Sequence, residues 1–122
     1  MSRARQVLGE RGESLACAEL QRRGYAILAR RYRTRFGEID IIASDASAIV
    51  FVEVKARMSG RFGDPAEAVT SQKQRRLASM AEDYLTRHHL QERPCRFDVV
   101  SVETESAAPT ITVYKDAFRP GW

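Results

Sequence analysis

The sequence has few cysteines, few histidines and no long apolar run. Its two cysteines, Cys17 and Cys95, lie far apart with no Cys-x-x-Cys or Cys/His spacing, which argues against a disulfide framework and a structural zinc site. The longest aliphatic and aromatic run, 49–54, is interrupted by Glu53 and falls well short of the roughly 20 residues of a membrane helix. Charges occupy the N-terminal positions that would be apolar in a secretory signal. We therefore expect a cytoplasmic protein with no membrane association.

Length and composition indicate one folded unit. The chain has 122 residues, of which 43% are hydrophobic and 30% charged, and this balance suits a single core of modest size. Internal repeats, low-complexity tracts and Pro/Ser/Gly-rich linkers are missing from the sequence. We expect a single domain over residues 1–122.

Positive charge is concentrated near the start of the chain. The formal net charge is +4, yet residues 1–35 hold nine arginines against three glutamates and so carry +6. Such a segment attracts a phosphate backbone, and the planar guanidinium suits phosphate geometry. The alternative is a solvated helix face in an arginine-rich protein, since arginine outnumbers lysine 17 to 3 throughout. The charge pattern favours nucleic acid as a partner.

Hydrophobic periodicity predicts two helices and five strands. The helices are expected over Gln6–Arg23, with Gly24 as the stop, and over Ser71–His88. The strands are expected over Tyr25–Tyr32, Gly37–Ala43, Ala48–Arg57, Arg96–Glu103 and Ile111–Lys115. A turn is expected over 33–36, a loop over 58–64 and a helix start at Asp64-Pro65. The order αβββαββ predicts an α/β fold with a mixed sheet flanked by helices.

The second and third strands should form a hairpin around the polar residues 44–47. Strand alternation puts four residues of the third strand on one face, Phe51, Glu53, Lys55 and Arg57. Glu38, Asp40 and Ile42 share a face of the second strand. If the two faces coincide, carboxylates, a lysine and an arginine meet on one side of a mostly apolar hairpin.

These charges are unusual for their surroundings. The strand that holds Glu53 and Lys55 is otherwise Ile-Val-Phe-Val-Val, which is typical of a central, buried strand where charge is costly unless a site requires it. The alternative is an exposed ion pair between the two side chains, worth about 0–1 kcal/mol. We favour a functional site.

The residue types suit metal-assisted hydrolysis of a phosphodiester. Mg²⁺ prefers oxygen ligands, and Asp40, Glu53 and the backbone carbonyl of Val54 provide them on adjacent strands. Lys55 projects from the same face as Glu53, where it would orient or activate the attacking water and offset developing negative charge.

The pattern Asp…Glu-x-Lys on a hairpin, after a helix that bears a glutamate, resembles the PD-(D/E)xK nucleases, which include archaeal Holliday-junction resolvases. A longer series looks like the small bacterial YraN-like (UPF0102-type) proteins and covers residues 9–102: Gly12-Glu13, Gly37-Glu38-Ile39-Asp40, Phe51-Val52-Glu53-Val54-Lys55-Ala56-Arg57, Lys73 and Arg96-Phe97-Asp98. The superfamily's proline is absent, because Ile39 precedes Asp40. The resemblance implies a restriction-endonuclease-like fold and a nuclease that uses Mg²⁺ or Mn²⁺ on DNA, branched or damaged DNA included.

The resemblance also implies roles for individual residues. Asp40 and Glu53 become the metal-binding carboxylates, Lys55 the catalytic lysine and Glu13 an acid that the first helix directs toward the metal. Without the resemblance, a glutamate in the position of Glu13 on a helix is more often a solvated or capping residue. We assign five residues to nucleic-acid contact: Arg57, Lys73, Gln72, Arg33 and Arg35. An alternative for Arg57 is a salt bridge.

Two other function classes stay open at this point. The first is a nucleic-acid-binding or accessory protein that keeps the nuclease fold without cleavage. The second is a protein-interaction scaffold whose charged hairpin face meets an acidic partner. A single copy of so small a chain has limited surface for holding a duplex. We therefore also consider a homodimer.

Overall fold

The computed structural model of the protein describes residues 3–57, 69–104 and 108–120. Its elements are α1 (Arg3–Arg22), β1 (Ala26–Thr34), β2 (Gly37–Asp45), β3 (Ala48–Arg57), α2 (Ser71–Arg87), β4 (Cys95–Glu103) and β5 (Thr110–Phe118). The expected order αβββαββ is confirmed. The expected loop over 58–64 and helix start at Asp64-Pro65 lie outside the described residues.

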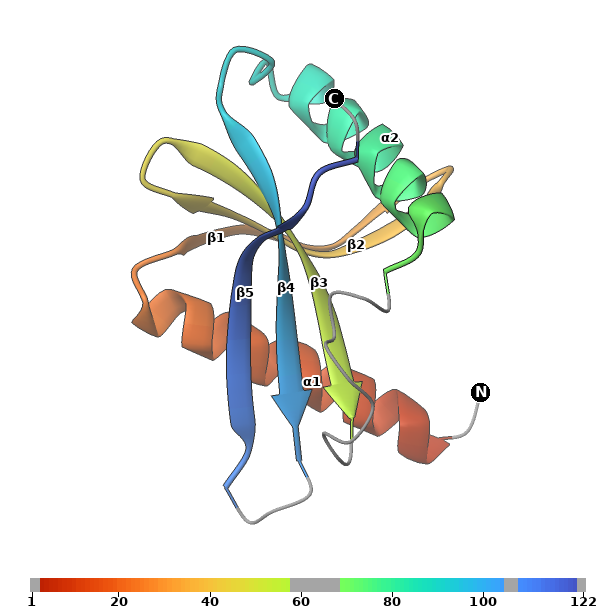
Figure 1. The fold of residues 1–122 in the computed structure, drawn as a ribbon, viewed down its shortest axis with the longest axis vertical. Coiled ribbons are helices and arrows are strands. Elements are labelled where there is room, and N and C mark those ends of the chain that lie inside the picture. Colours follow the sequence, from red (N-terminus) through yellow and green to blue (C-terminus); the bar gives the residue numbers. More distant parts are fainter. Residues whose placement is uncertain (1–2, 58–68, 105–107, 121–122) are drawn as a thin grey trace.

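The five strands form one mixed sheet in the order β1-β2-β3-β4-β5 (Figure 1). Neighbouring strands pair antiparallel except β3 and β4, which are parallel and are connected through α2. Because a parallel pair needs a crossover connection, the helix between these strands follows from the topology. β3 is therefore the central strand, with two neighbours on each side.

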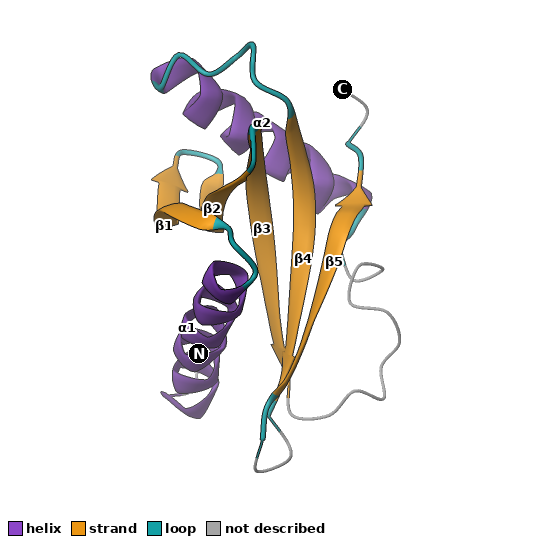
Figure 2. Cartoon of the chain, turned by 90° about the vertical axis from the view of Figure 1, so that its left-hand side faces the viewer, coloured by secondary structure: helices purple, strands orange, loops and turns teal. Residues whose placement is uncertain are grey.

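Each face of the sheet is covered by one helix (Figure 2). The α2-side cluster contains apolar residues of α2 and of the sheet, among them Leu77, Met80, Tyr84, Ile42, Phe51 and Phe97. The α1-side cluster contains apolar residues of α1 and of the opposite sheet face, among them Ala16, Leu20, Val50, Val52 and Val100. The α/β architecture is thus a mixed sheet between two helices, consistent with the expected restriction-endonuclease-like fold. Among the described residues, no helix has the length and apolar character of a membrane span.

The element ends follow local chemistry, and several elements are longer than expected. Gly24 follows α1 with a φ of +94°, a conformation that glycine adopts readily. β1 continues past Tyr32 because its antiparallel pairing with β2 extends to Thr34↔Gly37, so Arg33 lies in a strand rather than in a turn. β5 is likewise longer than predicted and extends to Phe118.

A buried charged network joins β4 to the elements beside it. The Asp98 side chain is fully buried and accepts hydrogen bonds from Tyr25 Oη at 3.0 Å, from Arg96 Nε at 2.9 Å and from the Asp116 backbone N–H at 3.0 Å. Arg96 also donates to Asp45 at 2.8 Å. Burial and the neighbouring Asp98 carboxylate raise the pKa of Tyr25 to about 12. A buried charge destabilises the fold unless it is paired and hydrogen-bonded. This network therefore fixes the relative positions of β2, β4, β5 and the end of α1.

Two glycines of α1 allow a matched test of how closely the helix approaches β3. A Cβ on Gly12 would lie 2.7 Å from Ala56 Cβ, whereas a Cβ on Gly9 would meet nothing within 4 Å. We expect Gly9→Ala to raise the free energy of unfolding by about 0.5–1 kcal/mol through helix propensity. Gly12→Ala should lower it by about 1–3 kcal/mol through overpacking. Urea denaturation measures both, and equal stabilisation by the two substitutions would contradict the close approach.

Candidate active site

Asp40 lies where β2 and β3 stop pairing. The Cα register of the two strands extends from Asp45↔Ala48 to Ile41↔Val52 and ends there. Beyond that point, Asp40 Oδ2 accepts a hydrogen bond from the Val54 backbone N–H at 2.8 Å. The aspartate side chain therefore replaces a ladder partner of β3, and this fixes the carboxylate against the peptide that follows Glu53.

The strict alternation predicted for β2 is interrupted at Asp40. Ile42 and Ile39 both belong to the α2-side cluster, whereas Ile41 belongs to the α1-side cluster. Residues 39 and 41 would share one face in a regular strand, so the expectation that Glu38, Asp40 and Ile42 lie on one face is wrong in detail. The change of face falls where the β2–β3 ladder ends, at Ile41, although β2 stays paired with β1 on its other side.

Glu53 lies on β3 in an almost closed environment. Only 8% of its side chain is exposed, and its Oε2 is in contact with Lys73 Nζ of α2 and lies 3.9 Å from Lys55 Nζ. Within the described residues, this buried oxygen has no hydrogen-bond partner beyond its two ammonium contacts. Two ammonium groups thus compensate one buried carboxylate, in the position where a cation would be held.

The electrostatics of the cluster show how strongly its groups are coupled. Burial, a hydrogen bond to Glu53 and the Glu53 charge raise the pKa of Asp40 to about 8. Burial opposes the charged form of Glu53, but the hydrogen bonds from Asp40 and Lys73 outweigh it and lower the Glu53 pKa. Burial and the adjacent Lys73 ammonium lower the pKa of Lys55. Lys55 is thereby brought closer to the range in which an amine exchanges protons near neutral pH.

Asp40 and Lys55 open onto a pocket of about 500 Å³ between α1 and the β2–β3 hairpin. The other residues that line it are Leu8, Gly9, Glu13, Val54 and Ala56. Glu53 lies outside this lining, next to Asp40 and toward α2. The pocket therefore gives a solvent-borne group access to Asp40, Lys55 and the Val54 backbone, with Glu53 behind them.

Glu13 reaches the pocket from α1 but already has a partner. Its Oε1 accepts a hydrogen bond from Arg31 Nε at 3.1 Å and lies 3.9 Å from Arg30 Nη2. Only 13% of the Glu13 side chain is exposed. The expected placement of a helix-borne acid beside Asp40 agrees with this geometry. Its pairing with Arg31 was not foreseen, because nothing in the spacing of the two residues links α1 to β1.

The donor set suits a hard divalent cation with incomplete protein coordination. Two carboxylates and a backbone carbonyl are oxygen ligands of the kind that Mg²⁺ and Mn²⁺ prefer. The described part of the chain has no group of three His, Cys, Asp or Glu side chains arranged for a metal. Asp40, Glu53 and the Val54 carbonyl would therefore hold the ion together with water. The buried Oε2 of Glu53, which contacts two ammonium groups, fits such an ion.

The remaining residues assigned to nucleic-acid contact are dispersed. Lys73 is at the site through its ion pair with Glu53, whereas Gln72 beside it is exposed. Arg33 pairs with Glu38 at 3.2 Å, and the Arg35 guanidinium lies 4.9 Å from the centre of the Phe36 ring. The side chain of Arg57, at the end of β3, is half-buried.

Comparison with known proteins identifies the family. The profile of the uncharacterised protein family UPF0102 matches residues 12–102. The chain belongs to this family. A UPF0102 protein of Nitrosococcus oceani is 47% identical over 91% of this chain and 90% of its own. One of Symbiobacterium thermophilum is 55% identical over 79% and 81%, and one of Geobacter metallireducens is 46% identical over 98% of both chains. The YraN-like (UPF0102-type) resemblance of the sequence is thereby confirmed.

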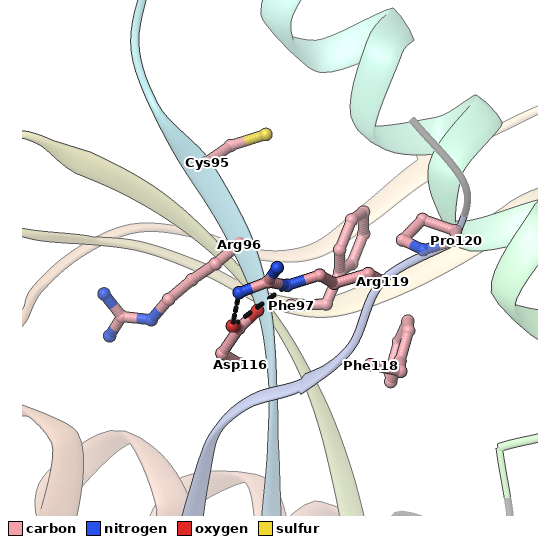
Figure 3. Close-up of a pocket in the computed structure, with 7 residues that line it drawn as sticks. All are labelled: Cys95, Arg96, Phe97, Asp116, Phe118, Arg119 and Pro120. Carbon is pink, nitrogen blue, oxygen red and sulfur yellow. Dashed lines mark hydrogen bonds and ion pairs between the residues drawn. The ribbon is translucent and has the colours of Figure 1, made fainter.

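A pocket of about 400 Å³ on the β4–β5 side of this UPF0102 protein has different chemistry (Figure 3). Its walls include the stacked rings of Phe97 and Phe118, and the ion pair of Arg119 with Asp116 lies at 2.7 Å. It brings together neither two carboxylates nor a lysine. The pocket at Asp40 is therefore the better candidate for hydrolytic chemistry.

Lys73→Met tests whether the Lys73 ammonium stands where a metal ion binds. We expect the metal-free variant to lose about 1–3 kcal/mol of unfolding free energy, because a buried carboxylate oxygen loses its closest partner. Mn²⁺ should then raise the melting temperature of the variant more than that of the wild type, since the competing cation is gone. Thermal denaturation with and without MnCl₂ measures both effects.

Lys115→Met is the matched control, because Lys115 is 57% exposed and pairs with Asp45 away from the site. Its response to Mn²⁺ should equal that of the wild type. Identical Mn²⁺ shifts for Lys73→Met and Lys115→Met would contradict the competition.

Proposed function

We propose that this UPF0102 protein is a metal-dependent nuclease that hydrolyses phosphodiester bonds in DNA, with branched or damaged DNA as the substrate class. The observation that carries the proposal is geometric: the buried Asp40 carboxylate bonds the Val54 backbone N–H, directly after the buried Glu53, and Lys55 lies 3.9 Å from Glu53 at a solvent-accessible pocket. Two such carboxylates oppose each other's ionisation, so their juxtaposition costs stability unless a cation is held there. A structural pair of this kind has no evident need for an open pocket.

The chain's own groups have distinct parts in the reaction. Asp40, Glu53 and the Val54 carbonyl would hold Mg²⁺ or Mn²⁺. When bound, the ion supplies Lewis-acid chemistry, polarising the phosphodiester and the attacking water. Lys55 either accepts a proton from that water, a role that its lowered pKa favours, or, as an ammonium, stabilises charge on the phosphate. The Asp40–Val54 hydrogen bond holds the carboxylate in position for this chemistry.

One observation favours the alternative of a non-cleaving nucleic-acid-binding or accessory protein. The ion pair between Lys73 and Glu53 already neutralises the buried carboxylate without any metal. In that case, the fold keeps the acids as a structural pair, and nucleic acid binds only through arginines. The two functions differ in whether a divalent ion changes the protein's stability and in whether DNA is cut.

The test is cleavage of a panel of linear, flapped, gapped and four-way DNA in MgCl₂ or MnCl₂. We expect cutting by the wild type that EDTA abolishes. Asp40→Asn and Lys55→Ala should each lower the rate by about 10²–10³-fold, because each removes a group that acts on the transition state. Gel electrophoresis of end-labelled strands measures the rates.

Glu38→Gln is the matched control for Asp40→Asn. It removes a carboxylate from the same strand that pairs with the exposed Arg33, and cleavage should stay at the wild-type rate. Cutting that survives in both Asp40→Asn and Lys55→Ala would overturn the proposal. DNA binding without any cutting would favour the non-cleaving alternative.

A further inference from the structure

A second pocket, of about 480 Å³, lies next to the candidate active site between α1 and β1. It is lined by Glu10 and Ser14 of α1 and by Arg30 and Arg31 of β1. Glu13 connects the two pockets, since it lines the Asp40 pocket and pairs with Arg31 of the second one. A group bound between the two arginines would therefore lie beside whatever is bound at Asp40.

Arg31 is held in this position by an unusual backbone. Its φ is +52°, in the left-handed region that a residue with a side chain adopts only at a cost. In the β1–β2 register it falls between Arg30↔Ile41 and Tyr32↔Ile39, which places it opposite Asp40. The strand thus departs from regular geometry at the residue that faces the candidate metal ligand, and Arg31 contacts Glu13 as a result.

The two guanidinium groups have capacity left for an anion. The side chains of Arg30 and Arg31 are 41% and 47% exposed. Among the residues that the structure describes, Arg30 makes long polar contacts, 3.4 Å to Ser14 Oγ and 3.9 Å to Glu13 Oε1. Within the described residues, the ion pairs of Arg31 all go to Glu13, which it contacts through Nε, so the outer edge of its guanidinium is open.

The chemistry of this pocket is that of a phosphate site. Two planar guanidinium forks and a serine hydroxyl present several donors, and such forks match the geometry of phosphate oxygens. Two carboxylates are also near: Glu13 pairs with Arg31, and Glu10, an exposed residue of α1, lines the pocket. A free carboxylate substrate would find the same donors, but a nucleic-acid strand offers successive phosphates for two neighbouring pockets.

We infer that Arg30, Arg31 and Ser14 bind a phosphate of the nucleic-acid strand adjacent to the one placed at Asp40. This inference rests on the proposed function, because it assigns the neighbouring position of the same substrate. Arg30 and Arg31 are positioning residues in this role. They fix where the nucleic-acid strand crosses α1, and they replace Arg33 of β1 and Arg35 of the following turn as the main basic contacts.

The experiment measures binding of a short fluorescein-labelled DNA duplex by fluorescence anisotropy, in EDTA and over a series of KCl concentrations. EDTA prevents cleavage, so the signal reports binding alone. We expect Arg30→Gln and Arg31→Gln each to reduce the slope of log K against log [KCl] by about 1, the value for one lost phosphate contact. The affinity should fall about tenfold at low salt.

Arg30→Lys and Arg119→Gln are the controls. Arg30→Lys keeps the charge and should keep the salt slope. Arg119→Gln removes an exposed arginine that pairs with Asp116, near the β4–β5 pocket, and should leave slope and affinity unchanged (Figure 3). The polar contacts described for Arg30 are long, so Arg30→Gln should stay folded even if Arg31→Gln does not, and circular dichroism checks this.

The two proposals fail in different ways. If the wild type cuts DNA but Arg30→Gln and Arg31→Gln keep its salt slope, the phosphate pocket is overturned and the nuclease proposal stands. If the slope falls in these variants but the wild type never cuts, the pocket stands and the nuclease proposal fails. A wild type without salt-dependent DNA binding overturns the pocket outright.

Discussion

The rest of the site depends on the contact between two buried carboxylates, Asp40 and Glu53. Burial, together with the neighbouring Glu53 carboxyl group, raises the pKa of Asp40. Two lysines compensate, Lys55 from the same strand and Lys73 from α2. The formal charges of the four side chains therefore balance, and in the proposed function a divalent cation would take the place that the Lys73 ammonium has beside Glu53.

The fold supplies this contact at its most constrained strand. β3 lies at the centre of the sheet with a helix on each face, so Glu53 cannot reach bulk water by a small movement. The early end of the β2–β3 ladder gives Asp40 the freedom to bond Val54 N–H with its side chain. On the other side, the close approach of α1 to β3 at Gly12 brings Glu13 to the pocket. The packing of β2 and α1 against β3 thus also sets the geometry of the site.

Much of this arrangement could be read from the sequence. Hydrophobic periods of about 3.6 and 2 residues predicted both helices and all five strands. Acidic residues in two otherwise apolar strands drew attention to Asp40 and Glu53. Lys73 was assigned to nucleic acid, and its ion pair with Glu53 was missed, because the contact spans a β–α crossover that no local pattern encodes. The break in alternation at Asp40 was also missed, since it depends on where the ladder ends. The Arg31–Glu13 pair depends on a left-handed residue that the sequence does not mark, because it is not glycine.

The most direct test of the central claim is anomalous diffraction from a crystal of the wild-type protein soaked in MnCl₂. The account predicts one strong anomalous peak between the Asp40 carboxylate, the Glu53 carboxylate and the Val54 carbonyl oxygen, with Lys73 Nζ moved away from Glu53 Oε2. No peak at this position, with Lys73 still in contact with Glu53, would contradict the account and leave the two acids as a structural pair.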